Sequence, residues 1–233
     1  MLEKIYNKKI ISAFLIAQPI IDVLTYFFKD YLNISITIGM VIRFLFLLYI
    51  GIYLVFYNKE DKKTTYTYLF ILLLVFLLNV GYNYFYKDSY NLLEEGKNIV
   101  KVLYFPVVLL FFLKYNQKNK KDKLSVNILL INAIVITSVL LISQYLGTEV
   151  CSYDDAFGCI SGNSGWFYSA NELSSILILI LSVVLYELFV KKEVSFLTII
   201  AFASVIYSML VIGTKSAYLG LIALVLGMAF LQF

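Results

Sequence analysis

The sequence predicts an all-α, polytopic membrane protein with about eight transmembrane helices and a cytoplasmic amino terminus. Apolar residues make up 61% of the 233 positions and charged residues only 15%, whereas a soluble domain has about 45–50% and about 25%. Long apolar runs recur along the whole chain, and the mean hydropathy is +0.86. Lysines gather in the short connections between these runs. So much apolar surface cannot be buried in one soluble core of this length, so lipid must be the solvent for most of it.

The apolar runs predict the positions of the membrane spans. A spanning helix needs about 20 mostly apolar residues, and the fourth run is short and contains Pro106. No small-residue cleavage site follows the first run, which therefore predicts a retained span rather than a signal peptide. We expect residues 1–233 to form a single transmembrane helical domain. Its spans are Ile10–Phe28, Ile36–Tyr57, Tyr66–Tyr86, Ile99–Leu113, Leu124–Leu146, Leu173–Val190, Ser195–Ile212 and Ala217–Phe233.

The lysines predict the orientation. Alternate connections carry most of them, and membrane proteins concentrate Lys and Arg in their cytoplasmic loops. The lysine-rich side holds Lys4, Lys8, Lys9, Lys59, Lys62, Lys63, Lys114, Lys118, Lys120, Lys121, Lys123, Lys191 and Lys192. The opposite side holds Lys29, Lys87, Lys97 and Lys215. The bias places the amino terminus in the cytoplasm, and such dispersed lysines indicate an anionic membrane surface rather than a nucleic acid as their partner.

The longest connection, Gly147–Asn171, is therefore expected outside the cytoplasm. It contains no Lys or Arg and is rich in Gly, Ser, Asn and Asp, which is typical of an ordered surface loop. Cys151 and Cys159 both lie in it. Outside the cytoplasm two such cysteines can form a disulfide that pins the loop, and in a reducing setting they would remain free thiols. The chain has no histidine, which excludes a histidine metal site or histidine base within it, and we expect no metal.

Five ionisable residues fall within or at the ends of the predicted spans, namely Asp22, Arg43, Lys101, Glu172 and Lys215. An ionisable side chain at the bilayer centre costs about 2.5–3.5 kcal/mol on insertion scales, so each residue is a candidate for function. With the predicted topology, all five belong to the extracytoplasmic half of the membrane. Their common depth is the most informative pattern in the sequence.

Asp22 and Arg43 lie on consecutive antiparallel spans at similar depth. One interpretation is a salt bridge that lets the two helices associate. The other makes Arg43 part of a phosphate site, with Asp22 holding its guanidinium in place, because the planar guanidinium can bind phosphate oxygens in a bidentate manner.

The other three candidates also have two interpretations each. Lys215 follows Thr214 at a helix start, where free N–H groups and a cation together bind anions; otherwise it is an interfacial lysine. Lys101 can assist at a phosphate site or extend to the membrane surface. Glu172 can be a first-turn acidic residue after an Asn171 N-cap, or a weak candidate for acceptor positioning or base catalysis.

Two other features give structural expectations. Trp166-Phe167-Tyr168, in the external loop, can insert into the outer leaflet or stack on a sugar ring, and the sequence does not separate these. Glu187, near the inner end of its span, is expected to reach Lys191, four positions further on.

Two stretches together resemble the O-antigen ligase and polymerase family of membrane glycan enzymes. In GWFYSANELSSIL, Gly165, Phe167, Asn171 and Leu173 occupy the places of a family pattern that follows an external loop. In GTKSAYLG, Gly213–Gly220, about 40 residues later, Thr214, Lys215, Ser216 and Ala217 resemble the family's Ser-Arg-Gly-Ala segment at a helix start. The opening QPIIDVLTYF, Gln18–Phe27, also resembles the first helix of Gram-positive members.

The resemblance implies a function in cell-surface polysaccharide biosynthesis. Family members transfer glycans from undecaprenyl pyrophosphate to a glycan, lipid or wall acceptor at the outer face of the bacterial cytoplasmic membrane. They need neither a metal nor another cofactor, because the lipid pyrophosphate is the leaving group. Arg43, Lys101 and Lys215 would bind this pyrophosphate, with Asp22, Asn171 and Thr214 in support.

This sequence departs from the family pattern in two ways. Lys215 replaces an arginine, which keeps the charge and loses the bidentate fork. The family also has a further external loop and further helices beyond this point, so we expect the chain to be the amino-terminal portion of a longer enzyme. The general base would then lie beyond Phe233. The alternatives are a membrane transporter or flippase for a polar or lipid-linked substrate, with Asp22, Arg43 and Glu172 along its pathway, and a scaffold without chemistry.

Overall fold

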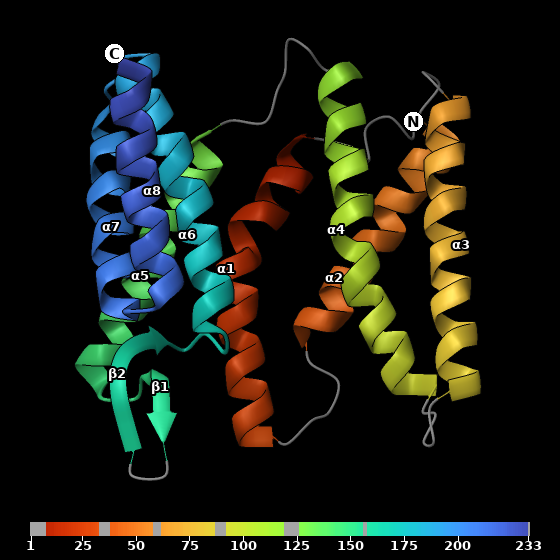
Figure 1. The fold of residues 1–233 in the computed structure, drawn as a ribbon, viewed down its shortest axis with the longest axis horizontal. Coiled ribbons are helices and arrows are strands. Elements are labelled where there is room, and N and C mark those ends of the chain that lie inside the picture. Colours follow the sequence, from red (N-terminus) through yellow and green to blue (C-terminus); the bar gives the residue numbers. More distant parts are fainter. Residues whose placement is uncertain are drawn as a thin grey trace. The chain divides into compact units, whose positions relative to one another are not determined.

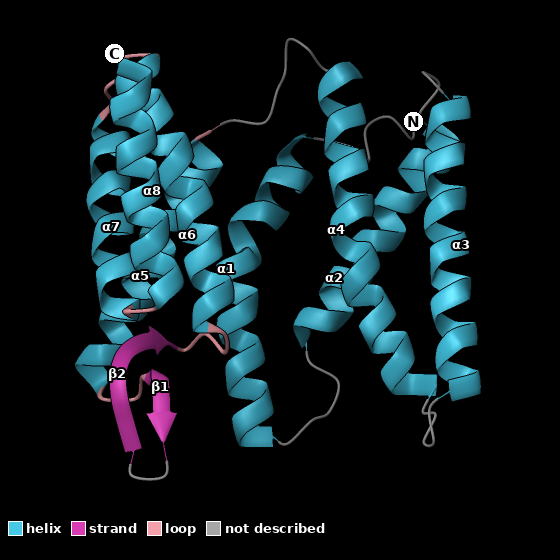
Figure 2. Ribbon diagram, viewed as in Figure 1, coloured by secondary structure: helices cyan, strands magenta, loops and turns pink. Residues whose placement is uncertain are grey.

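The computed structural model describes residues 8–32, 38–57, 62–86, 92–118, 126–155 and 158–232. These residues form eight α-helices, two short π-helical segments and one two-stranded sheet (Figures 1 and 2). In chain order they are α1 (Lys8–Leu32), α2 (Ile38–Ile52), η2 (Tyr53–Tyr57), α3 (Lys62–Tyr86), α4 (Leu92–Lys118), α5 (Asn127–Leu146), β1 (Val150–Asp155), β2 (Gly158–Gly165), α6 (Ala170–Leu185), η3 (Tyr186–Val190), α7 (Phe196–Ile212) and α8 (Lys215–Gln232). The predicted all-α, polytopic membrane class is confirmed.

Each α-helix lies at the position of one predicted span. Five helical segments are long and apolar enough to cross a membrane, at Lys8–Lys29, Ile38–Phe56, Lys62–Tyr86, Asn127–Leu146 and Ala170–Val190. Two more, Phe196–Ile212 and Lys215–Met228, are apolar but shorter. The number of spans and the cytoplasmic amino terminus therefore remain predictions.

The fourth helix differs most from its prediction. The sequence suggested a short segment around Pro106, whereas α4 runs for 27 residues with Pro106 inside it. A proline removes one N–H group and one helical hydrogen bond. The apolar residues on both sides of Pro106 still favour a helix, so the loss does not end it.

The chain forms two compact units, one of Met1–Tyr6 and Gly39–Lys123 and one of Asn7–Ile38 and Leu124–Phe233. In the first, aromatic rings join α2 and η2 to α4. Phe111 is fully buried, and its ring centroid lies 5.1 Å from that of Tyr53 and 6.4 Å from that of Phe46. The expected single domain stays a prediction.

The second unit is a helical bundle that packs through small residues. Ala133, Ala201 and Ala217 are completely buried among the larger side chains of the core. Within the same bundle, Thr137 Oγ1 lies 2.7 Å from Ser208 Oγ and 3.0 Å from the carbonyl oxygen of Ser204. Small residues and interhelical hydroxyl bonds are the contacts that hold helices together in lipid, where the surrounding chains are as apolar as the protein.

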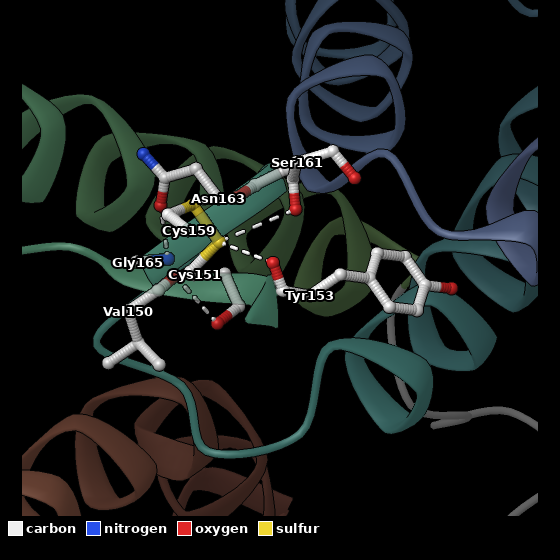
Figure 3. The surroundings of a disulfide bond; sticks show 9 residues. Val150, Cys151, Tyr153, Cys159, Ser161, Asn163 and Gly165 are labelled. Atoms are coloured by element: carbon white, nitrogen blue, oxygen red, sulfur yellow. Dashed lines mark hydrogen bonds between the residues drawn. A yellow bond between two sulfur atoms is a disulfide. The ribbon is translucent and has the colours of Figure 1, made fainter. Parts of the chain in front are cut away.

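A β-hairpin occupies most of the loop between α5 and α6, where the sequence predicted only an ordered loop. Strands β1 and β2 are antiparallel, with Cys151 opposite Asn163 and Cys159 opposite Asp154. Cys151 and Cys159 form a disulfide across the two strands, with a Cα–Cα distance of 5.5 Å (Figure 3). The disulfide therefore joins the second residue of β1 to the second residue of β2.

Glycines let the hairpin lie directly on the bundle. Gly162 has φ +74° and sits against the carbonyl group of Ile212, which a Cβ atom at Gly162 would overlap. Gly213, with φ +66°, would place a Cβ atom 3.3 Å from Gly162 Cα. Because both glycines have left-handed backbone conformations, any other residue would add strain as well as bulk. The hairpin is thus anchored at the junction of α7 and α8.

The η3 segment that follows α6 contains a buried carboxylate, Glu187, which pairs with a nearby lysine. Glu187 is only 7% exposed, and Lys191 Nζ lies 2.6 Å from Glu187 Oε1. The expected Glu187–Lys191 pair is confirmed. The hydrogen bond from Lys191 to the Glu187 carboxylate raises the pKa of Lys191 above its usual value, because it favours the charged amine.

We predict that Gly162→Ala detaches the hairpin from the bundle. The left-handed φ and the overlap with Ile212 together should cost about 2–4 kcal/mol, measured as faster proteolysis of the hairpin in detergent. Gly147→Ala is the matched control, since Gly147 has φ +62° but no atom within 4 Å of the place that a Cβ atom would take. It should cost only about 1 kcal/mol. Equal proteolysis rates in the two variants would contradict this mode of hairpin docking.

Candidate anion-binding site

The amino-terminal ends of α6 and α8 lie together at the hairpin end of the second unit (Figure 1). Ser174, in the second turn of α6, and Thr214, just before α8, are both fully buried. Their hydroxyl oxygens are 2.6 Å apart. Farther along the two helices, Gly220 of α8 packs so closely on Ile178 of α6 that a Cβ atom would clash with it. The two helix starts are therefore held side by side.

Thr214 also caps α8. Its Oγ1 accepts a hydrogen bond from the backbone N–H of Ala217 at 3.2 Å and lies 3.1 Å from Ser216 Oγ. One hydroxyl thus satisfies a free amide of the first turn, as an N-cap does. Thr214 therefore has a structural role as the N-cap of α8, and its predicted supporting role at a ligand stays a prediction.

Asn171 meets Ser216 across the two helices. Ser216 Oγ donates to Asn171 Oδ1 at 3.2 Å, which leaves the amide nitrogen of Asn171 as a donor at the exposed surface. The N-cap of α6 is Ser169, whose hydroxyl accepts from the backbone N–H of Glu172 at 3.3 Å. The interpretation of Asn171 as the N-cap was wrong, because the helix already begins at Ala170 and Asn171 lies inside its first turn.

Lys215 is the first residue of α8 and is exposed. Its backbone N–H donates to the hydroxyl of Tyr153 at 3.4 Å. Tyr153 is in β1, and its ring extends away from the disulfide (Figure 3). Tyr153 was not among the residues predicted from the sequence, because nothing in the local pattern indicates that β1 folds back onto α8.

This arrangement has the chemistry of an anion site. The amino-terminal end of a helix carries about half a positive charge and unpaired N–H groups. Two such ends meet here, and Lys215, the Asn171 amide and the Tyr153 hydroxyl belong to the same end of the bundle. Glu172 is exposed on the first turn of α6, where a carboxylate is stabilised by the same helix dipole. Its suggested part in catalysis stays a prediction.

Asp22 lines a separate small cavity of about 70 Å³ between α1, α5 and α6. Its polar wall is Gln18, Asp22 and Asn132, and its apolar wall is Pro19, Ile136, Phe167, Leu173 and Ile176. Since Leu173 and Ser174 are adjacent in α6, this cavity and the anion site lie at the same level of that helix.

A missing hydrogen bond in α1 explains why the polar side chain of Asn132 contacts that helix. Pro19 has no N–H, so the carbonyl oxygen of Leu15 lacks its usual partner four residues on. Asn132 of α5 replaces that partner, donating from Nδ2 to Leu15 at 3.0 Å. The Oδ1 atom of Asn132 is buried and has no partner within the described part of the chain.

The Trp166-Phe167-Tyr168 segment packs against α1. Phe167 is buried, whereas the Trp166 ring centroid lies 5.0 Å from that of Phe27. The amine of Lys29 lies 4.4 Å from the Tyr168 ring centroid. These aromatic residues therefore join α1 to the base of the hairpin.

The remaining predicted residues belong to the first unit. Arg43 is half-buried on α2, and Lys101 is exposed on α4. The structure thus brings Asn171, Thr214 and Lys215 together, with Glu172 beside them. Arg43 and Lys101 belong to the other compact unit. Among the residues that the structure describes, no three of His, Cys, Asp and Glu are grouped so that they could hold a metal ion.

The fold defines a helical membrane protein, and its candidate anion-binding site lies at one end of a bundle. Residues 4–233 match the family model described as O-antigen ligase like membrane protein. The chain therefore belongs to this family, as the two sequence motifs indicated. No curated protein and no solved structure matches it significantly.

We predict that Asn132 and Pro19 are energetically coupled. Asn132→Leu should destabilise the protein by about 0.5–2 kcal/mol, because it leaves the Leu15 carbonyl unpaired in the bundle. In a Pro19→Ala background, α1 supplies its own N–H, so the same change should cost much less. The measurement is a double-mutant cycle of unfolding free energies in detergent. Equal costs in the two backgrounds would show that Asn132 acts in another way.

Proposed function

We propose that this protein transfers a glycan from undecaprenyl pyrophosphate to an acceptor at the outer face of the bacterial cytoplasmic membrane. The observation that carries the proposal is the meeting of two helix amino-terminal ends with Lys215 at one surface. A pyrophosphate needs several donors and positive charge in one place, and helix starts supply both.

The lysine distribution supports the location of this surface. If the lysine-rich connections are cytoplasmic, the hairpin and the starts of α6 and α8 face outward. The disulfide in the hairpin agrees with that side, because disulfides persist outside the reducing cytoplasm. The anion site would then lie where lipid-linked glycans present their pyrophosphate.

The proposed reaction is a displacement at the anomeric carbon of the donor. A hydroxyl oxygen of the acceptor forms a bond to that carbon, and the bond from the carbon to the pyrophosphate oxygen breaks. The departing pyrophosphate gains negative charge, which Lys215 and the positive amino-terminal ends of α6 and α8 would stabilise. The acceptor's proton passes to a base, for which Glu172 is a weak candidate.

The sequence also predicts a phosphate-binding role for Arg43, with Asp22 as the partner of its guanidinium, and an assisting role for Lys101. Asn171 would donate its amide to the anion bound beside Lys215. These roles rest on the sequence pattern and on the membrane depth it predicts.

We predict that Lys215→Ala in the intact coding sequence makes cells accumulate lipid-linked glycan while the protein level stays unchanged. Loss of one charge-stabilising donor should slow transfer by about 10²-fold. Lys215→Arg should retain most activity, because it keeps the cation. The readout is the ratio of lipid-linked to transferred glycan in labelled cells.

Lys62→Ala is the matched control, since Lys62 is an exposed lysine at the start of α3 and outside the site. It should leave that ratio unchanged. Normal glycan transfer in Lys215→Ala cells would contradict the assignment of the pyrophosphate site.

A further inference from the structure

The hydroxyl of Tyr153 lies at the amino-terminal end of α8. The backbone N–H of Lys215, the first residue of that helix, donates to the Tyr153 hydroxyl at 3.4 Å. The two residues are 62 positions apart in the sequence. The first N–H groups of a helix have no partner within the helix, and they bind anions. The tyrosine oxygen therefore lies where an oxygen atom of a bound anion would lie.

The hairpin holds Tyr153 in this position. Tyr153 is in β1, two residues after Cys151, and its ring extends away from the disulfide (Figure 3). Cys159, the other half of the disulfide, lies opposite Asp154, the residue after Tyr153. A two-stranded hairpin alone is marginally stable, and a disulfide restricts its unfolded chain. Together with the contact of Gly162 on the bundle, the disulfide keeps the ring at the start of α8.

The Tyr153 hydroxyl still has a proton to donate. A phenolic O–H can donate one hydrogen bond while its oxygen accepts others. Within the described part of the chain, the only hydrogen bond of this hydroxyl is the one that it accepts from Lys215. The Tyr153 side chain is half-buried, and Lys215 is exposed. The proton is therefore available to a ligand that binds at the start of α8.

A phosphate oxygen would bind this amide more strongly than the tyrosine oxygen does. The present N···O distance of 3.4 Å is long for a hydrogen bond from a backbone N–H, for which about 2.9–3.0 Å is usual. Bonds to an ionised oxygen are shorter and roughly twice as strong. If a phosphate oxygen accepts from both the Lys215 N–H and the Tyr153 O–H, two such bonds replace one weak bond. The exchange therefore favours the bound anion.

We propose that Tyr153 is a binding residue for the pyrophosphate of the lipid-linked donor. Its hydroxyl moves from accepting the Lys215 N–H to donating to the phosphate oxygen that takes its place. This assignment rests on the proposed function, to which it adds a residue of the hairpin that neither sequence motif contains. It also gives the hairpin a part in selecting a phosphorylated lipid over the corresponding alcohol.

The test is the affinity of the purified protein in detergent for undecaprenyl pyrophosphate, with undecaprenol as the phosphate-free arm. Tyr153→Phe keeps the ring and removes only the hydroxyl. It should lower the affinity for the pyrophosphate about ten-fold, because one hydrogen bond to a charged group is lost. The affinity for undecaprenol should not change. Tyr145→Phe is the matched control, since Tyr145 is 91% exposed at the end of α5, and it should leave both affinities unchanged.

A second measurement uses the unaltered chain and does not depend on the folding of a variant. Undecaprenyl pyrophosphate should slow the nitration of Tyr153 by tetranitromethane and should leave the nitration rate of Tyr145 unchanged, as followed by peptide mass spectrometry. Undecaprenol should protect neither tyrosine.

Three results would overturn the assignment and leave Tyr153 as a contact that fixes the hairpin on α8. They are an unchanged pyrophosphate affinity in Tyr153→Phe, an equal loss of affinity for both lipids, and nitration of Tyr153 at the same rate with and without the pyrophosphate. Lys215→Ala separates this failure from that of the proposed function. If Lys215→Ala lowers the pyrophosphate affinity and Tyr153→Phe does not, only the assignment of Tyr153 fails. If neither variant lowers it, the proposed pyrophosphate site fails as well.

Discussion

The hydrogen bond between Ser174 and Thr214 is the contact on which the candidate anion site depends. It fixes the start of α8 beside the second turn of α6, in a fully buried position where an unpaired hydroxyl would be costly. Because Thr214 also caps α8, the same oxygen sets where that helix begins. Lys215, the next residue, is thereby the first residue of α8.

The hairpin completes this arrangement through backbone contacts. Gly162 and Gly213 allow β2 to lie directly on the α7–α8 junction, and Tyr153 of β1 reaches the first amide of α8. A phosphate oxygen at that amide would take the place of the Tyr153 hydroxyl, which could then donate to it. The disulfide-closed hairpin therefore belongs to the candidate site and is more than a connection between α5 and α6.

Much of the fold could be predicted from the sequence, because hydropathy alone marks helices in lipid. The eight apolar runs coincide with eight helices, and the Glu187–Lys191 pair followed from its spacing. The hairpin was missed because apolar and polar residues alternate only weakly along its strands. It is held instead by the disulfide and by glycine contacts with helices that are distant in the sequence. The full length of α4 was missed because Pro106 and nearby charged residues lower the hydropathy and the helix propensity of this stretch. Packing of α4 on its neighbours keeps it helical.

The candidate site was predictable in its residue types and only partly in its geometry. Asn171, Thr214 and Lys215 were identified from two motifs about 40 residues apart, and the structure joins them. Three contacts could not be derived from the sequence. They are the capping of α6 by Ser169, the hydrogen bond between Tyr153 and the start of α8, and the hydrogen bond from Asn132 to the Leu15 carbonyl. Each depends on which helices are neighbours, and a single sequence does not contain that information.

The central claim is that Lys215 lies at an outward-facing pyrophosphate site. The most direct measurement introduces Lys215→Cys and follows its reaction with a membrane-impermeant maleimide in intact cells and inverted vesicles; the two native cysteines are joined in a disulfide and so do not compete. We expect labelling in intact cells only, slowed by added undecaprenyl pyrophosphate. Labelling in inverted vesicles only, or a rate unaffected by the lipid, would contradict the claim.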